Sequence, residues 1–99
     1  MTSPVVFLRA ARQEFDEAAD WYESRLRGLG TTFTSAVDHA LERIVDRPDF
    51  YPAVWNDVRE ALVARFPYCV YYRASPERIL VVAIFHTARD PSAWRGRTF

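Results

Sequence analysis

The sequence predicts an α+β domain in which a helical hairpin packs on one face of an antiparallel sheet. Apolar residues recur with helical spacing through residues 11–45, strand-like runs fill residues 58–86, and a glycine-rich turn divides the helical stretch in two. The chain has 99 residues, of which 49% are hydrophobic and 15% aromatic. This is enough for one core, so we treat residues 1–99 as a single domain.

The first predicted element is a short strand over residues 4–8, where β-branched side chains follow a proline. A helix is expected over residues 11–26, because apolar side chains recur there at intervals of three and four and acidic side chains occupy the opposite face. Gly28 and Gly30 are expected to end this helix.

The second predicted helix covers residues 33–45 with the same apolar period. Thr31 or Thr32 can cap its start, and Arg47-Pro48 is expected to end it because the residue before a proline disfavours helix. The short connection makes the two helices antiparallel neighbours. Both are amphipathic, so their apolar stripes need a third surface to cover.

The C-terminal half is expected to form the sheet. Residues 49–57 are predicted to be a loop, and strands are predicted over residues 58–66, 68–74 and 78–86. Short links make these three strands an antiparallel meander. The last strand is the most apolar and is expected inside the sheet, and residues 90–99 are expected to be irregular or to form one short turn.

All 13 basic side chains are arginines, and they balance 13 acids. The balance is uneven, since residues 1–50 carry a net charge of −3 and residues 51–99 carry +3. Alternation along residues 58–66 divides the strand into two sets. The set with Leu62 and Phe66 is the more apolar and is expected to face the helices. Arg59 and Arg65 are then on the open face of the sheet, where Arg73 and Arg89 can join them. These four arginines are candidates for binding a phosphate or carboxylate. The alternative is an ordinary solvated sheet face with paired charges.

A second candidate is the turn after the last strand, where His86 is followed by Arg89. A histidine there can serve as an acid or base near neutral pH, and an arginine can stabilise an anion. The alternative is that both side chains only stabilise the turn. Cys69 is the single cysteine and His39 the only other histidine, so we expect no metal site and no cofactor.

The longest strongly apolar run has seven residues, from Ile79 to Phe85, and it is too short to cross a bilayer. No targeting segment is recognisable, so we expect a cytoplasmic protein with no membrane partner. Most aromatic residues fit helix stripes or strands and are expected in the core. Tyr51 and Trp55 fall in the predicted loop and are better placed to contact a partner.

Several short motifs together resemble the RelE/ParE family of toxins from type II toxin–antitoxin systems, and most of all its ParE-like, plasmid-stabilisation branch. The resemblance runs in order from about residue 6 to residue 97. The motifs are Ala18-Ala19-Asp20-Trp21-Tyr22-Glu23, Gly28-Leu29-Gly30, Pro48-x-x-x-Pro52, Arg65-Phe66-Pro67-Tyr68-x-x-x-Tyr72-Arg73 and His86-x-x-Arg89-Asp90-Pro91-x-x-Trp94.

The resemblance implies a bacterial toxin held in a hetero-oligomer by a cognate antitoxin, which Trp21, Tyr51, Trp55 and Trp94 would contact. The ParE-like branch is associated with poisoning of DNA gyrase, and the RelE-like branch cleaves mRNA on the ribosome. Nuclease members commonly carry an arginine where this chain has Cys69, and they use lysines that this chain lacks. We therefore favour gyrase as the target and no catalysis.

Two alternatives stay open: an mRNA interferase that uses His86, Arg89 and Arg65, or a family member that is not toxic and only binds its antitoxin.

Overall fold

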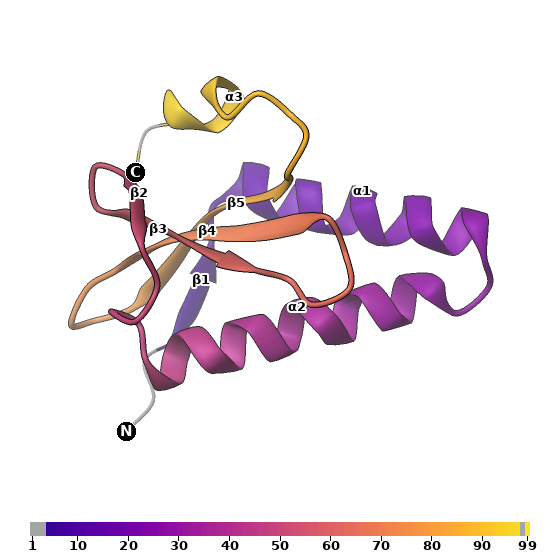
Figure 1. The fold of residues 1–99 in the computed structure, drawn as a ribbon, viewed down its shortest axis with the longest axis horizontal. Coiled ribbons are helices and arrows are strands. Elements are labelled where there is room, and N and C mark those ends of the chain that lie inside the picture. The colour runs from indigo at the N-terminus through magenta and orange to yellow at the C-terminus, as the bar shows by residue number, and fades with distance from the viewer. Residues whose placement is uncertain (1–3, 98) are drawn as a thin grey trace.

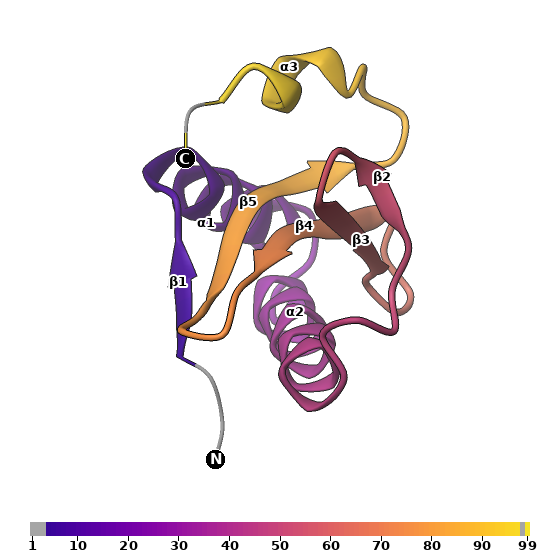
Figure 2. The same ribbon diagram turned by 90° about the vertical axis from the view of Figure 1, so that its left-hand side faces the viewer.

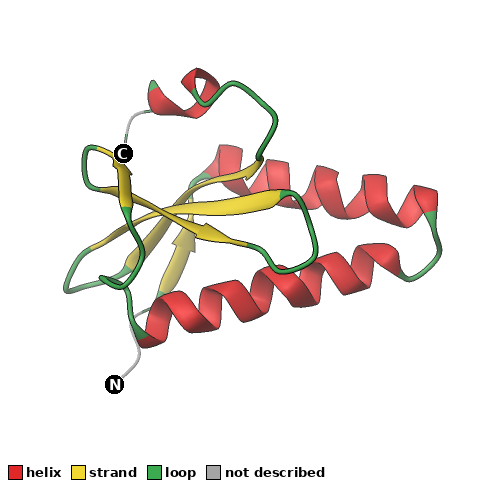
Figure 3. Ribbon diagram, viewed as in Figure 1, coloured by secondary structure: helices red, strands yellow, loops and turns green. Residues whose placement is uncertain are grey.

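The computed structural model describes residues 4–97 and 99 and contains the predicted α+β arrangement (Figure 1). A helical hairpin and a small C-terminal helix lie against a five-stranded sheet (Figure 3). In chain order the elements are β1 (Val5–Phe7), α1 (Arg9–Arg25), α2 (Leu29–Asp46), β2 (Ala53–Trp55), β3 (Val58–Leu62), β4 (Tyr68–Ala74), β5 (Ile79–His86) and α3 (Ser92–Arg95).

The strand order in the sheet is β1-β5-β4-β3-β2. Strands β3, β4 and β5 form the predicted antiparallel meander, and β5 has a strand on each side as expected. Two features of the sheet were not predicted. β1 pairs with β5 in the parallel direction, and the expected loop over residues 49–57 contains β2, which pairs with β3 at the outer edge.

The hairpin of α1 and α2 covers one face of the sheet (Figure 1). Its centre is an aromatic cluster in which the Tyr22 and Phe66 ring centroids lie 4.9 Å apart and the Phe33 and Tyr68 centroids 5.1 Å apart. Such edge-to-face contacts add to the stabilisation from burial. Leu26, predicted to lie on the apolar stripe of the first helix, is instead exposed at the end of α1.

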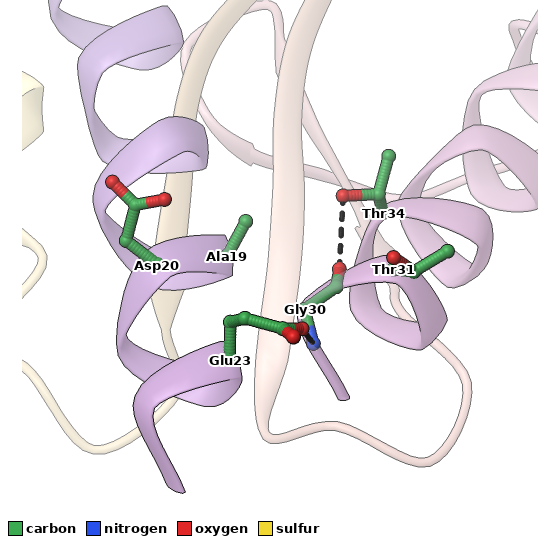
Figure 4. A pocket seen from close by; sticks show the side chains of 6 residues that line it. All are labelled: Ala19, Asp20, Glu23, Gly30, Thr31 and Thr34. Atoms are coloured by element: carbon green, nitrogen blue, oxygen red, sulfur yellow. Dashed lines mark hydrogen bonds between the residues drawn. The ribbon is translucent and has the colours of Figure 1, made fainter. Parts of the chain in front are cut away.

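The turn of the hairpin is tighter than predicted. Gly30 does not end α1 but lies inside α2, and neither threonine caps that helix. Instead the Glu23 carboxylate of α1 accepts the backbone N–H of Gly28 at 2.9 Å. It also accepts the backbone N–H of Gly30 at 3.0 Å (Figure 4). A Cβ on Gly30 would lie 2.6 Å from the carbonyl oxygen of Ala19, so glycine lets the helices approach closely here.

Strand β3 is shorter than predicted and presents the opposite face to the hairpin. It ends at Leu62, and Arg65 lies in the following turn with a left-handed φ of 72°. Ala61 and Val63 are buried in the core beneath the hairpin, whereas Leu62 is 61% exposed. The prediction that the more apolar set with Leu62 faces the hairpin is therefore wrong.

The second face of the sheet is covered by α3 (Figure 2). In β5, Val82 is an extra residue, because Val81 and Ala83 pair with the adjacent Tyr72 and Tyr71. This bulge shifts the alternation, so β5 buries side chains on both faces. The buried Trp94 ring of α3 stacks on Tyr71 with centroids 4.5 Å apart.

An ion pair completes the unpaired edge of β5. β1 pairs only with residues 79–81, and beyond them the Glu14 carboxylate of α1 accepts the Ile84 backbone N–H at 3.2 Å. The Arg97 guanidinium donates to the Val82 carbonyl at 2.8 Å and to Glu14 at 3.0 Å. Two side chains thus replace a neighbouring strand, which protects the edge from pairing with another chain.

Candidate interaction surfaces

Two of the four arginines predicted to bind an anion are already bound to other groups of the fold. The Arg59 guanidinium donates to the backbone carbonyls of Asp49, at 3.2 Å, and Tyr51. Arg59 is in register with Tyr72, whose ring belongs to the core beneath the hairpin, so the prediction that Arg59 lies on the open face is wrong. Arg73 forms an ion pair with Asp57 at 2.7 Å.

The other two arginines lie in exposed turns. Arg65 is in the β3–β4 turn, not on a strand as predicted, and borders a hollow against α2. Arg89 follows β5, and its guanidinium lies over the Phe85 ring, 4.1 Å from the centroid. Neither guanidinium forms an ion pair with another described residue, so each can receive an anion from outside. The four arginines therefore do not form one row.

Two hydrogen bonds in the turn after β5 involve His86. The His86 Nδ1 atom accepts the Ala88 backbone N–H at 3.0 Å, and the Arg89 N–H donates to the His86 carbonyl at 3.1 Å. A neutral imidazole has one lone pair, so its proton must be on Nε2. In this arrangement the Nε2 N–H of His86 is a hydrogen-bond donor.

The three residues that a nuclease would use lie at one end of the sheet, in the two turns next to the start of β4. His86 pairs in register with Tyr68, and the two rings meet edge to face at 5.3 Å. Burial raises the pKa of Tyr68, and nearby Tyr22 raises it further, whereas Arg89 opposes the shift. Arg65 faces the α2 side instead. The arrangement can hold an anion at Arg89, but it does not pair a base with that arginine.

The aromatic candidates divide into exposed and buried residues. Trp21 on α1 is 52% exposed, with the Arg25 guanidinium 4.6 Å from its ring centroid. Trp55 on β2 is 40% exposed, with Arg95 at 4.8 Å. Trp94 is only 1% exposed and belongs to the core, so it presents no docking surface in this structure.

The half-buried Tyr51 packs against Phe50 and Tyr72, with centroids 5.2 and 6.4 Å away. One edge of its ring is therefore covered by the core side of the sheet and another by an exposed aromatic residue.

Reactive groups elsewhere on the sheet are held neutral. Burial raises the pKa of the Cys69 thiol to about 11 and that of Tyr72 to about 12. Burial also raises the pKa of Tyr71, whose hydroxyl donates to Glu60 at 2.7 Å. None of the three is a nucleophile near neutral pH. Among the described residues, no helix has the length and apolar character needed to cross a bilayer.

Residues 5–91 match the family model described as the ParE toxin of the type II toxin–antitoxin system parDE. The chain belongs to the ParE toxin family. A solved structure described as a chromosomal ParDE toxin–antitoxin system from P. aeruginosa shares this fold, with a TM-score of 0.72 over 86% of this chain and 96% of that one. The sequence identity is 17%. The curated proteins contain no match.

Sequence reasoning missed several residues that shape the surface of this ParE-family chain. Arg43 and Arg47 follow His39 on α2 at intervals of four, yet only their helical period was considered. Arg43 donates to the Leu62 carbonyl at 3.2 Å and lies beside Arg65 in one hollow. The four-residue spacing of three basic side chains was the available signal, because it places them on one side of the helix.

Proposed function

We propose that this ParE-family chain is a toxin that inhibits growth by binding DNA gyrase, performs no catalysis, and is neutralised by a cognate antitoxin in a hetero-oligomer. Membership of the family supports the toxin role. The observation that carries the non-catalytic part is the occupied lone pair of His86. Cleavage of RNA needs a group that takes the proton from the 2′-hydroxyl, and His86 offers a donor in its place.

Arg89 is the residue we assign to target contact. Its guanidinium is exposed and stacks on the buried Phe85 ring, and the turn around it is held by hydrogen bonds to the Nδ1 atom and the carbonyl oxygen of His86. A stacked arginine loses little further freedom when it binds and can meet a carboxylate or phosphate with two parallel hydrogen bonds. This makes the end of β5 a suitable place for an acidic or phosphate-bearing surface of the target.

The exposed aromatic residues support an antitoxin that binds in an extended form. Trp21 lies towards the tip of the hairpin and Trp55 on β2, and these regions occupy opposite ends of the longest axis of the molecule (Figure 1). That axis is 39 Å long. An extended segment needs about 12 residues to span it. A segment that folds on binding can reach both sites, whereas a compact domain would cover only one.

A supercoiling assay tests the gyrase proposal. Gyrase, ATP and relaxed plasmid are incubated with wild-type chain, Arg89→Ala or Arg78→Ala, each first shown to be folded by circular dichroism. Arg78 lies in the β4–β5 turn at the other end of the sheet and is the matched control. We expect wild type and Arg78→Ala to inhibit supercoiling equally, and Arg89→Ala to need about tenfold more protein, the loss expected for one charged hydrogen-bond partner.

Absence of inhibition by folded wild type would overturn the gyrase proposal. Primer extension on ribosome-bound mRNA is run with the same samples. Cuts made by wild type and lost in Arg89→Ala would identify an mRNA interferase instead. Growth arrest on induction, compared with an uninduced culture, separates both from a non-toxic family member.

A further inference from the structure

The segment after β5 is a β-turn that begins at His86 and ends at Arg89. The Arg89 N–H donates to the His86 carbonyl at 3.1 Å, which makes these two residues the first and the fourth of the turn. The Ala88 N–H, two residues after His86, donates to the Nδ1 atom at 3.0 Å. Asparagine and aspartate accept this same hydrogen bond from the first position of many turns. His86 uses an imidazole nitrogen in place of their side-chain oxygen.

A further hydrogen bond joins the turn to the sheet. The Thr87 N–H donates to the carbonyl of Pro67, the residue before β4, at 2.8 Å. Three successive N–H groups of the turn, at residues 87–89, thus have acceptors. Only the acceptor of Ala88 is a side-chain atom, so a substitution of His86 removes this hydrogen bond and leaves the two backbone acceptors in place.

The turn carries the chain from one face of the sheet to the other. His86 meets the Tyr68 ring, which packs on the hairpin side, edge to face at 5.3 Å. The preceding Phe85 belongs to the core beneath α3. The Arg89 guanidinium lies over that Phe85 ring, 4.1 Å from its centroid. The conformation of the turn therefore decides whether Arg89 reaches Phe85.

The acceptor at Nδ1 exists only while the imidazole is neutral. A protonated imidazole has a hydrogen on both nitrogens, so Nδ1–H would face the Ala88 N–H as a second donor. The charged or titratable side chains around the imidazole come from its own turn, β4, the β3–β4 turn and α1. They are Arg89, Tyr68, Arg65, Tyr22 and Glu14, the last two acting through Tyr68. Of these residue types and histidine, only histidine ordinarily changes charge between about pH 5 and 8.

We propose that His86 is a positioning residue for target contact: its neutral Nδ1 holds the turn that places Arg89 over Phe85, and protonation of the imidazole releases Arg89. The inference rests on the proposed function, which assigns target contact to Arg89. A purely electrostatic role of His86 would have the opposite sign, because a second positive charge beside Arg89 would attract an acidic or phosphate-bearing surface more strongly. Loss of the turn instead weakens binding as the pH falls.

The test compares wild type, His86→Asn and His86→Phe, each first shown to be folded by circular dichroism. His86→Asn keeps an acceptor for the Ala88 N–H and has no proton to gain in this pH range, whereas His86→Phe keeps a ring against Tyr68 but has no acceptor. Affinity for immobilised gyrase is measured from pH 8 to pH 6. Ratios between variants at each pH cancel any change in gyrase itself.

At pH 8 we expect His86→Asn to bind within about twofold of wild type and His86→Phe to bind up to about tenfold more weakly, the loss expected for one hydrogen bond. As the pH falls, wild type should weaken relative to His86→Asn and approach His86→Phe. Full binding by His86→Phe with loss in His86→Asn would assign the effect to the ring contact with Tyr68 and overturn the proposal. So would wild type that gains affinity relative to His86→Asn at low pH.

Proton NMR of the free chain from pH 8 to pH 5 gives a readout that does not need gyrase. The Phe85 ring current shifts the side-chain signals of Arg89 upfield. This shift should persist in His86→Asn, shrink in His86→Phe, and shrink in wild type as the His86 ring signals titrate. An unchanged Arg89 shift in His86→Phe or through that titration would overturn the positioning role. Failure of wild type to bind gyrase would remove the proposed target alone, because the Arg89 signals decide the role of His86 without it.

Discussion

The two faces of the sheet are covered in very different ways. The hairpin covers one face with two long helices and an aromatic cluster, and Glu23 joins the helices at their turn. The other face is covered by four-residue α3, held by one buried tryptophan and by the Glu14–Arg97 pair beside it. The N–H groups of Trp94 Nε1 and Arg95 Nε are also buried, without a hydrogen-bond partner among the described residues. The hairpin cover, formed by α1 and α2, is therefore held by many contacts, whereas the α3 cover depends on single residues.

Removal of the Trp94 side chain should give the largest loss of stability. Trp94→Ala leaves a cavity over Tyr71, and we expect it to lower the free energy of unfolding by about 3–5 kcal/mol in urea denaturation. Trp21→Ala removes the same side chain from the hairpin surface and should cost well under 1 kcal/mol. Similar losses in the two variants would contradict the contrast between the covers.

Removal of one partner of the Glu14–Arg97 pair should give the next largest loss of stability. Its side chains are 16% and 18% exposed, so removal of one partner leaves a poorly solvated charge and unpaired backbone groups on β5. We expect Arg97→Gln to cost about 3 kcal/mol. In a double-mutant cycle, Glu14→Gln should then cost much less in the Arg97→Gln background. Additive losses would show that the two residues act separately.

A substitution at Gly30, where α1 and α2 approach closely, tests the hairpin cover. Gly30→Ala brings a methyl group against the Ala19 carbonyl and should cost about 1–3 kcal/mol as the helices separate. Gly96→Ala, where a Cβ would meet nothing within 4 Å, is the control and should be close to neutral. If Gly30→Ala were equally neutral, the hairpin would be less tightly packed than the structure indicates.

The reactivity of the Cys69 thiol tests the α3 cover, and this test involves the smallest change in stability. Its thiol is buried beside Trp94, and burial raises its pKa from 9.0 to about 11. Wild type should therefore react slowly with a thiol reagent at pH 8, and Trp94→Ala should react much faster. Because the thiol ionises first in the unfolded chain, its contribution to stability is complete below pH 9 and is lost between pH 9 and 11. A fast reaction in wild type would show that α3 does not protect this face.

The difference between the two faces of the sheet also explains which parts of the fold could be predicted from the sequence. The hairpin was predictable because each helix repeats a local apolar period, which buries Phe15 and Phe33. The α3 side was not predictable, because it joins Glu14 to Arg97 across most of the chain and Tyr71 of β4 to Trp94 beyond β5. At β3, apolar character favoured burial of the set with Leu62, yet the structure buries Ala61 and the following Val63. The predicted arginine row failed because Arg59 completes the loop before β2 and Arg65 lies in a turn.

The parallel pairing of β1 with β5 has a consequence for synthesis of the toxin. A nascent chain that has reached β4 holds the entire hairpin and most of the sheet, but β1 has no neighbour until residues 79–81 have been added. The edge beyond them stays open until Arg97 follows. The fold can therefore close only after residue 97 has been added, so the β1–β5 pairing and the Glu14–Arg97 contact are among the last to form.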